Sequence, residues 1–125
     1  IIGIYNISED YINQKKREIS NEITRRYRAY KGKYELQSLE NKIVILADDG
    51  VATGFTTRAA ISYIKSQNPK KIILAIPVAP ADFSKQIEKE VEFVRLHSTN
   101  LLFAISQFYE HFPQLSDEEV KNYLK

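Results

Sequence analysis

Apolar positions along the chain follow two different patterns, and the first of them has the spacing of a helix. Between residues 12 and 30 the apolar side chains are spaced by seven, four, four and three residues, which places them on one side of a helix. These residues are Ile12, Ile19, Ile23, Tyr27 and Tyr30. Ser8 or Asp10 can cap the start of this helix, and Lys31-Gly32-Lys33 is expected to end it.

The second pattern consists of continuous apolar runs, which are typical of strands covered on both faces. Three such runs predict strands over residues 43–47, 72–78 and 93–96, and helices are expected between them over residues 56–66 and 83–90. Strand, helix, strand, helix, strand makes two successive crossover units. The sequence therefore predicts an α/β fold with an open, mainly parallel sheet and flanking helices.

The two ends of the chain carry further signals. Residues 1–5 resemble a strand, and a translated chain does not usually start inside one, so we expect N-terminal sequence to be missing. Near the C-terminus, Ser116 and Glu119 form the pattern of a capping box, and Leu115 can pack on Val120 as a hydrophobic staple. A last short helix is predicted to begin there.

Composition excludes several classes of protein. The 125 residues include no cysteine, which rules out disulfides, thiolate metal sites and cysteine nucleophiles. The longest nearly apolar run, residues 72–81, is about half a membrane span and contains two prolines, so no membrane crossing is predicted. No secretory signal pattern is visible, and we expect a cytoplasmic protein. A net charge of +2 is too small to indicate nucleic-acid binding by itself.

Candidate chemistry is concentrated after the first buried run, where Asp48 and Asp49 are followed by a loop with two glycines. In open α/β sheets, ligands bind at the carboxyl ends of the strands. Gly50 and Gly54 allow backbone amides to surround an anion, and the following helix N-terminus adds partial positive charge. Hydroxyl donors come from Thr53, Thr56 and Thr57. Carboxylates instead accept hydrogen bonds from hydroxyls, so the segment offers a phosphate site beside a diol acceptor, as a ribose 5-phosphate requires.

Other interpretations of this segment fit less well. A Walker-type loop needs four residues between its glycines and then a lysine, whereas three residues separate Gly50 from Gly54 and Phe55 follows. The dinucleotide-binding fingerprint does not occur. A receiver domain would need an acid at the end of the next strand, and residues 72–80 contain none. A plain turn with a capped helix leaves the adjacent acid pair unexplained.

Residues 44–56, VILADDGVATGFT, resemble the phosphoribosyl diphosphate signature of type I phosphoribosyltransferases. The resemblance extends to the uncharacterised predicted phosphoribosyltransferases of bacteria and archaea through RRYRAYKG, RAAI, IPVAP and FYEHFPQLSDEEV. It covers almost the whole chain, so we expect residues 1–125 to form a single phosphoribosyltransferase-like domain. The family's separate pyrophosphate-binding loop lies on a strand earlier than Ile1, which implies an incomplete domain.

The resemblance implies transfer of ribose 5-phosphate from phosphoribosyl diphosphate to a nitrogenous base, with release of pyrophosphate. Mg²⁺ would be held mainly by the diphosphate, the ribose and water, and no side chain is assigned as a metal ligand. Asp48 and Asp49 would contact the ribose hydroxyls as catalytic residues. The residues expected to bind substrate are Gly50, Val51, Ala52, Thr53, Gly54, Phe55, Thr56 and Arg28. Enzymes for 6-oxopurines carry an acid where this chain has Ala52, which disfavours a hypoxanthine-guanine acceptor.

Several alternatives stay open. A domain of the same fold could sense phosphoribosyl diphosphate or a nucleotide without catalysis, and a homodimer is expected in either case. The eight Lys and Arg residues between positions 15 and 33 could approach the diphosphate, or form a solvated helix face with a dimer contact; nucleic-acid binding is the least favoured interpretation. Four aromatic residues could stack on a base, although core packing is favoured: Phe103, Phe108, Tyr109 and Phe112. His97 and His111 are assigned no role.

Overall fold

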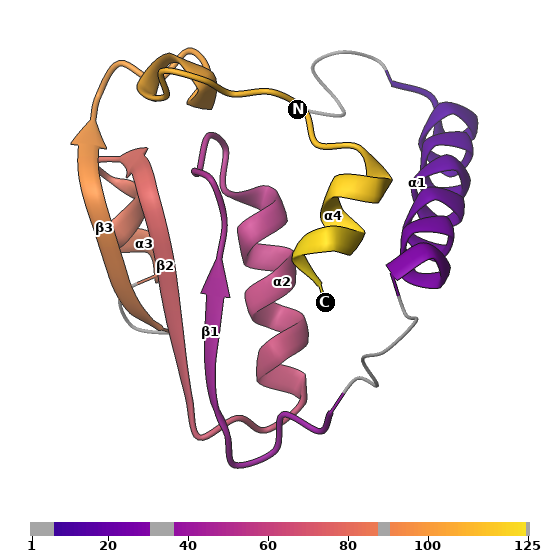
Figure 1. The fold of residues 1–125 in the computed structure, drawn as a ribbon, viewed down its shortest axis with the longest axis horizontal. Helices are drawn as coiled ribbons and strands as arrows, with labels where there is room; N and C mark the ends of the chain where they lie inside the picture. The colour runs from indigo at the N-terminus through magenta and orange to yellow at the C-terminus, as the bar shows by residue number, and fades with distance from the viewer. Residues whose placement is uncertain (1–6, 31–36, 88–90, 125) are drawn as a thin grey trace. The chain divides into compact units, whose positions relative to one another are not determined.

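The computed structural model describes residues 7–30, 37–87 and 91–124, which fall into two compact units. The sheet unit comprises residues 37–113, and the helical unit comprises the remaining residues at the two ends of the chain (Figure 1). The strand expected at residues 1–5, the helix end expected at residues 31–33 and the last residues of the helix expected at 83–90 lie outside the described residues.

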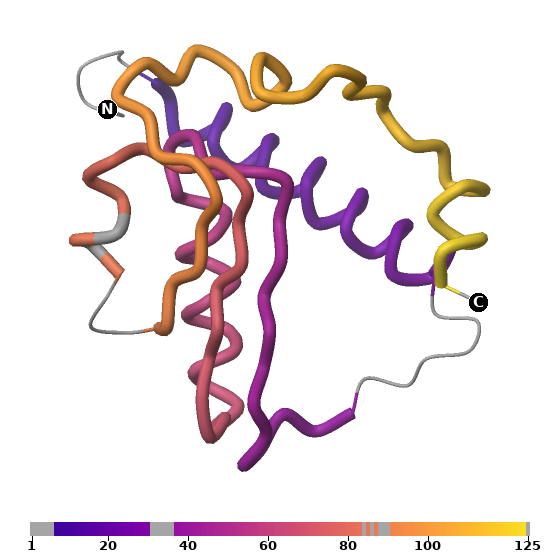
Figure 2. The backbone as a smooth tube through the Cα atoms, turned by 60° about the vertical axis from the view of Figure 1, so that its left-hand side comes forward, coloured from indigo at the N-terminus to yellow at the C-terminus, as the bar shows by residue number. Residues whose placement is uncertain are grey.

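The sheet unit contains three parallel strands in the order β1-β2-β3, whose common course can be followed in Figure 2. Their bounds are β1 Ile43–Ala47, β2 Lys71–Pro80 and β3 Glu92–Thr99. Helix α2 (Phe55–Ser66) connects β1 to β2, and α3 (Phe83–Ile87) lies between β2 and β3. The predicted α/β fold with a parallel sheet is therefore confirmed. β1 has the predicted bounds, whereas β2 and β3 extend beyond the apolar runs.

The core lies on one face of this sheet. Leu74, on the central strand, is completely buried, and both connecting helices contribute to the same cluster. The other members from β2, α2 and α3 are Ile72, Ile76, Ile61, Ile64, Phe83 and Ile87. Two right-handed crossovers that run in the same direction across a sheet place both helices on the same side. That is why the core has a single layer of helices.

The opposite face of the sheet is covered by neither connecting helix, and here one prediction was wrong. Residues 43–47 were expected to be covered on both faces, yet Ile45 is 67% exposed, and Leu96 on β3 is 86% exposed. A continuous apolar run shows that a strand can be buried, but it does not show on which face of the sheet the helices pack. Neither α2 nor α3 packs on this second face.

The helical unit contains α1 (Glu9–Tyr30) and α4 (Asp117–Tyr123), which lie side by side (Figure 1). Ser8 caps α1 by accepting a hydrogen bond of 3.2 Å from the Tyr11 amide. The predicted capping box of α4 is confirmed, since the Ser116 hydroxyl accepts from the Glu119 amide at 3.3 Å. The apolar stripe predicted on α1 does form one side of a helix, but none of its residues is buried. No described helix is long and apolar enough to cross a membrane.

Candidate functional site

The acid pair lies at the carboxyl end of β1, where the chain leaves the sheet. The Asp48 amide still donates to the Ala75 carbonyl of β2 at 3.4 Å, which extends the strand pairing by one bond. The Asp49 amide donates to Asp48 Oδ1 at 3.0 Å. Both residues are exposed as a whole, but partial burial of its carboxyl raises the pKa of Asp48, and the hydrogen bond from the Asp49 amide opposes that rise. Two carboxylates are thus available to hydrogen-bond donors at this edge.

The loop that follows is fixed by Val51. Its amide donates to the Val78 carbonyl at 3.0 Å, and its side chain is buried in the core. A bond to a sheet carbonyl occupies this N–H, so the expectation that the Val51 amide binds phosphate is corrected: Val51 anchors the loop. The expected phosphate donors accordingly begin at Ala52.

The two glycines of the loop have different functions. Gly54 has φ of +77°, a left-handed conformation that L side chains rarely adopt, and it precedes the first residue of α2. A Cβ atom at Gly54 would also lie 2.5 Å from the Phe83 ring. At Gly50 the constraint is packing, because a Cβ there would lie 2.6 Å from Cδ1 of Ile105. Only Gly54 therefore provides the unusual backbone that a nest requires.

The start of α2 presents unbonded amides. The first helical bond runs from the Arg58 amide to the Gly54 carbonyl at 2.9 Å, so the preceding amides have no partner within the helix. Within the described chain, the amides of residues 52–57 donate to no backbone carbonyl. Thr53 and Thr56 are exposed, whereas Thr57 is buried. Unbonded amides at a helix N-terminus, next to a left-handed glycine, favour an anion such as phosphate.

A segment from a distant part of the sequence contacts the acid pair. Residues 101–112, which include the short 3₁₀ helix η1 (Ile105–Phe108), follow β3. The Tyr109 hydroxyl donates to the Asp49 carbonyl at 2.6 Å. Sequence reasoning considered Tyr109 only for stacking or core packing and missed this contact, because 60 residues separate the two partners and no local pattern signals their meeting.

The other aromatic residues of this segment have different surroundings. Phe108 packs on His97 with a centroid distance of 5.2 Å, and Phe112 packs on Tyr109 at 5.0 Å. Phe103 is strongly exposed. Phe108 and Phe112 thus pack on neighbouring aromatic rings, outside the apolar core that the sequence favoured for them. Stacking of Phe103 on a base stays a prediction.

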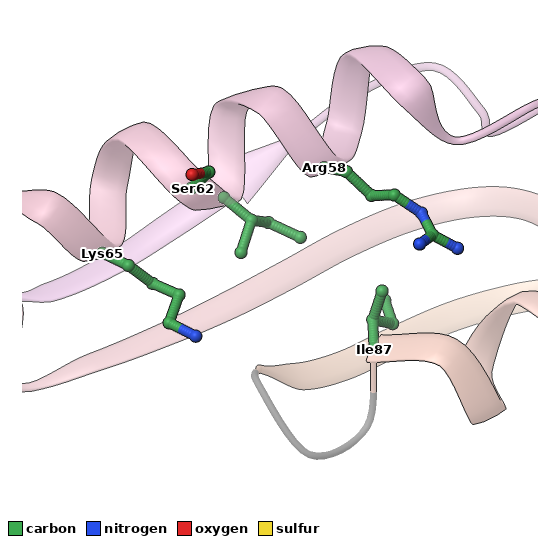
Figure 3. A pocket seen from close by; sticks show the side chains of 5 residues that line it. Arg58, Ser62, Lys65 and Ile87 are labelled. Atoms are coloured by element: carbon green, nitrogen blue, oxygen red, sulfur yellow. The ribbon is translucent and has the colours of Figure 1, made fainter.

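Two cavities lie on opposite faces of the sheet. One, of about 330 Å³, adjoins Asp48 on the face that neither connecting helix covers and is otherwise lined mainly by apolar residues of the three strands. The other, of about 350 Å³, lies between α2 and α3, where Arg58 and Lys65 extend from α2 alongside Ile87 (Figure 3). Arg58 is exposed and lines this cavity between the helices.

The predicted basic residues belong to the helical unit. Arg28 is exposed in the last turn of α1, and its role toward substrate stays a prediction. Arg25 and Arg26 both bond to Glu22, and Arg25 also pairs with Asp117 of α4 at 2.5 Å. Among the described residues, no group of three or more His, Asp or Glu side chains is placed to hold a metal ion.

Comparison with known proteins finds relatives named as phosphoribosyl transferases. Two sequences from strains of Mycobacterium tuberculosis, named "Putative phosphoribosyl transferase MT0597" and "Putative phosphoribosyl transferase Rv0571c", are each 34% identical over 104 residues. The match includes 82% of this chain and 24% of each relative, so the chain spans about a quarter of the length of these relatives.

The fold is also shared with a solved structure. The crystal structure of TT1426 from Thermus thermophilus superposes with a TM-score of 0.78 at 24% identity, covering 98% of this chain and 59% of that one. The family described as "Phosphoribosyl transferase domain" matches residues 7–109, which include both acids, the whole loop and Tyr109. The chain belongs to the phosphoribosyl transferase domain family.

Proposed function

We propose that this chain transfers ribose 5-phosphate from phosphoribosyl diphosphate to a nitrogenous base and releases pyrophosphate. The observation that carries the proposal is the turn between β1 and α2, where two exposed carboxylates stand directly before a run of unbonded amides. Hydroxyls and a phosphate separated by one sugar ring are the groups that such a turn complements. A cytoplasmic location and a homodimer are further parts of the proposal, and they rest on the sequence alone.

Asp48 and Asp49 accept hydrogen bonds from the 2′- and 3′-hydroxyls of the ribose. Bonds to ionised acceptors are roughly twice as strong as neutral ones, which is why carboxylates suit a diol. Carboxylate oxygens are also ligands of the kind that Mg²⁺ prefers, so the pair fits an ion held mainly by the substrate and its water. When bound, such an ion neutralises charge on the diphosphate.

The 5′-phosphate binds at the start of α2. Its donors are the amides from Ala52 to Thr56 and the exposed hydroxyls of Thr53 and Thr56. Gly54 gives the backbone the curvature that directs successive N–H groups toward one point. The Val51 side chain is buried, and the Val51 amide donates to the Val78 carbonyl. Both contacts keep the loop from moving when the anion binds.

The proposed reaction requires no side chain as a covalent nucleophile or as a general acid. The bond between C1′ and the diphosphate oxygen breaks, and its electron pair leaves with pyrophosphate. A ring nitrogen of the base forms the new bond to C1′ and loses its proton to solvent. Fixing both ends of the ribosyl phosphate leaves C1′ exposed to the base in a defined orientation, so catalysis is mainly positioning and charge stabilisation.

The test replaces both acids, as Asp48→Asn with Asp49→Asn, in the full chain. Calorimetric titration with phosphoribosyl diphosphate and Mg²⁺ should show binding to the parent and none to the double variant, because the two asparagine side chains are neutral and cannot replace ionised acceptors. Glu40→Gln, which removes an exposed acid before the opposite end of β1, is the matched control and should bind as the parent does. Unchanged affinity in the double variant would remove Asp48 and Asp49 from the site.

Turnover is tested separately, by pyrophosphate release across a panel of purine and pyrimidine bases. Release with one base by the parent, absent from the double variant, identifies the acceptor and supports the transferase. Tight binding without release for any base would favour the non-catalytic sensor of the same fold.

A further inference from the structure

The turn that carries the acid pair is bonded to β2 on either side of its centre, but not at the centre itself. The Asp48 amide donates to Ala75 at 3.4 Å, and the Val51 amide donates to Val78 at 3.0 Å. Between these two bonds lie two peptides, Asp48–Asp49 and Asp49–Gly50. The N–H of the first donates to Asp48 Oδ1 at 3.0 Å, whereas strand pairing leaves the orientation of the second undetermined.

The segment after β3 makes the missing contacts. The Tyr109 hydroxyl donates to the carbonyl of this peptide, on Asp49, at 2.6 Å. On the adjoining residue, the side chain of Ile105 occupies the space that a Cβ at Gly50 would need. No cis peptide bond occurs in the described residues, so the Gly50 N–H points away from the carbonyl that Tyr109 holds. One hydrogen bond and one packing contact thus fix the rotation of the peptide plane.

The segment is itself well supported, so it can act as a fixed reference. The Gln107 side chain donates to the Leu101 carbonyl at 3.0 Å and accepts from the Ala104 amide at 3.4 Å. The Tyr109 amide donates to the Ser106 carbonyl at 3.2 Å, and the Tyr109 ring packs on Phe112. These contacts hold the phenol in place independently of any ligand.

From this geometry we infer that Tyr109 is a positioning residue for the acid pair: it sets the plane of the Asp49–Gly50 peptide and so aims both carboxylates at the ribose diol. That the carboxylates bind a ribose diol rests on the proposed function. The contact between Tyr109 and the Asp49 carbonyl is present in the free protein. Tyr109 touches the backbone carbonyl and is given no contact with the substrate. Its effect is therefore expected on diol binding and not on phosphate binding.

Tyr109→Phe in the full chain tests the inference, because it removes the hydroxyl and keeps the ring. Loss of one hydrogen bond should weaken binding of phosphoribosyl diphosphate with Mg²⁺ by about threefold to tenfold. The affinity for inorganic phosphate, measured on the same samples, should stay at the parent value, because the amides of residues 52–56 do not depend on Tyr109. Tyr63→Phe is the matched control, since Tyr63 is 59% exposed on α2, and it should leave both affinities unchanged.

A second measurement needs no ligand. Amide hydrogen exchange at residues 48–51 should be faster in Tyr109→Phe than in Tyr63→Phe, while exchange in β2 is the same in both. Slower or equal exchange at residues 48–51 would overturn the inference whatever the ligand data show.

The outcomes separate the two proposals. If the parent binds phosphoribosyl diphosphate and Tyr109→Phe binds it equally well, the positioning role is wrong and the proposed function stands. Equal weakening of both ligands would indicate general loosening and also overturn the inference. If the parent binds inorganic phosphate but no phosphoribosyl diphosphate, the proposed function fails, and the aim inferred for Tyr109 fails with it.

Discussion

The sheet unit and the helical unit are stabilised by different forces. In the sheet unit, apolar side chains from β2, α2 and α3 form one continuous core, and Leu74 and Ala79 are completely buried. In the helical unit, no described residue of α1 or α4 is buried, and the helices are joined by polar contacts to Asp117. Apolar packing therefore stabilises the first unit, whereas exposed polar contacts join the described helices of the second.

This difference explains where the candidate site lies. Binding a diol and a phosphate at once requires groups held within a fraction of an ångström, which rigid elements provide best. The turn between β1 and α2 meets that requirement because Val51 anchors it in the core. Arg25 and Arg26 of α1 are exposed and bonded to Glu22, so any action of theirs on an anion would be weak and salt-dependent.

The largest contrast is expected from truncation of apolar side chains in the two units. Leu74→Ala should lower the free energy of unfolding of the sheet unit by about 2–5 kcal/mol, because it leaves a cavity in a packed core. Ile23→Ala on α1 should change stability by no more than about 0.5 kcal/mol, since Ile23 is 63% exposed. Urea unfolding followed by circular dichroism measures both. Equal losses would mean that the apolar stripe of α1 is covered in solution.

A smaller loss of stability, together with a large loss of phosphate binding, is expected from a change at Gly54. Gly54→Ala should cost about 1–2 kcal/mol from the left-handed backbone alone, and more from the contact with the Phe83 ring. Inorganic phosphate should bind much more weakly, because the amides before α2 would turn away. Combining the change with Phe83→Ala removes the ring contact but not the backbone strain. Full recovery of phosphate binding in that pair would contradict a conformational role for Gly54.

The smallest effect concerns the charges of the helical unit. Hydrogen bonds from Arg25 and Tyr30 lower the pKa of Asp117 from 3.8 to about 2. A carboxyl with a depressed pKa in the folded state stabilises above its unfolded pKa, and the contribution is lost as the pH falls. The contact between α1 and α4 should therefore weaken between about pH 4 and pH 2, as followed by a nuclear magnetic resonance titration of Asp117.

Arg25→Gln is the matched change for this titration. It removes the charged hydrogen-bond donor that contributes most to the lowered pKa of Asp117, and it keeps a long polar side chain. The Asp117 midpoint should then rise toward 3.8, and added salt should move the parent in the same direction because the pair is exposed. A parent midpoint already near 3.8 at low salt would show that Arg25 and Asp117 do not interact in solution.

Local patterns in the sequence predicted much of this molecule. The continuous apolar run predicted β1 with its bounds, and the helical spacing predicted α1. The residues of the capping box predicted the start of α4, because a cap involves groups only three residues apart. The acid pair and the glycines likewise identified the candidate site, since its groups are contiguous in the chain.

Tertiary structure alone decided how those groups are used. It left one face of β1 open, bonded the Val51 amide to Val78 and so removed it from the expected phosphate donors, and made Gly50 necessary for the packing of Ile105. It also brought Tyr109 to the Asp49 carbonyl across 60 residues. A sequence pattern reports the preferences of neighbours along the chain, whereas these contacts depend on which strand lies beside which and on which side the helices cross.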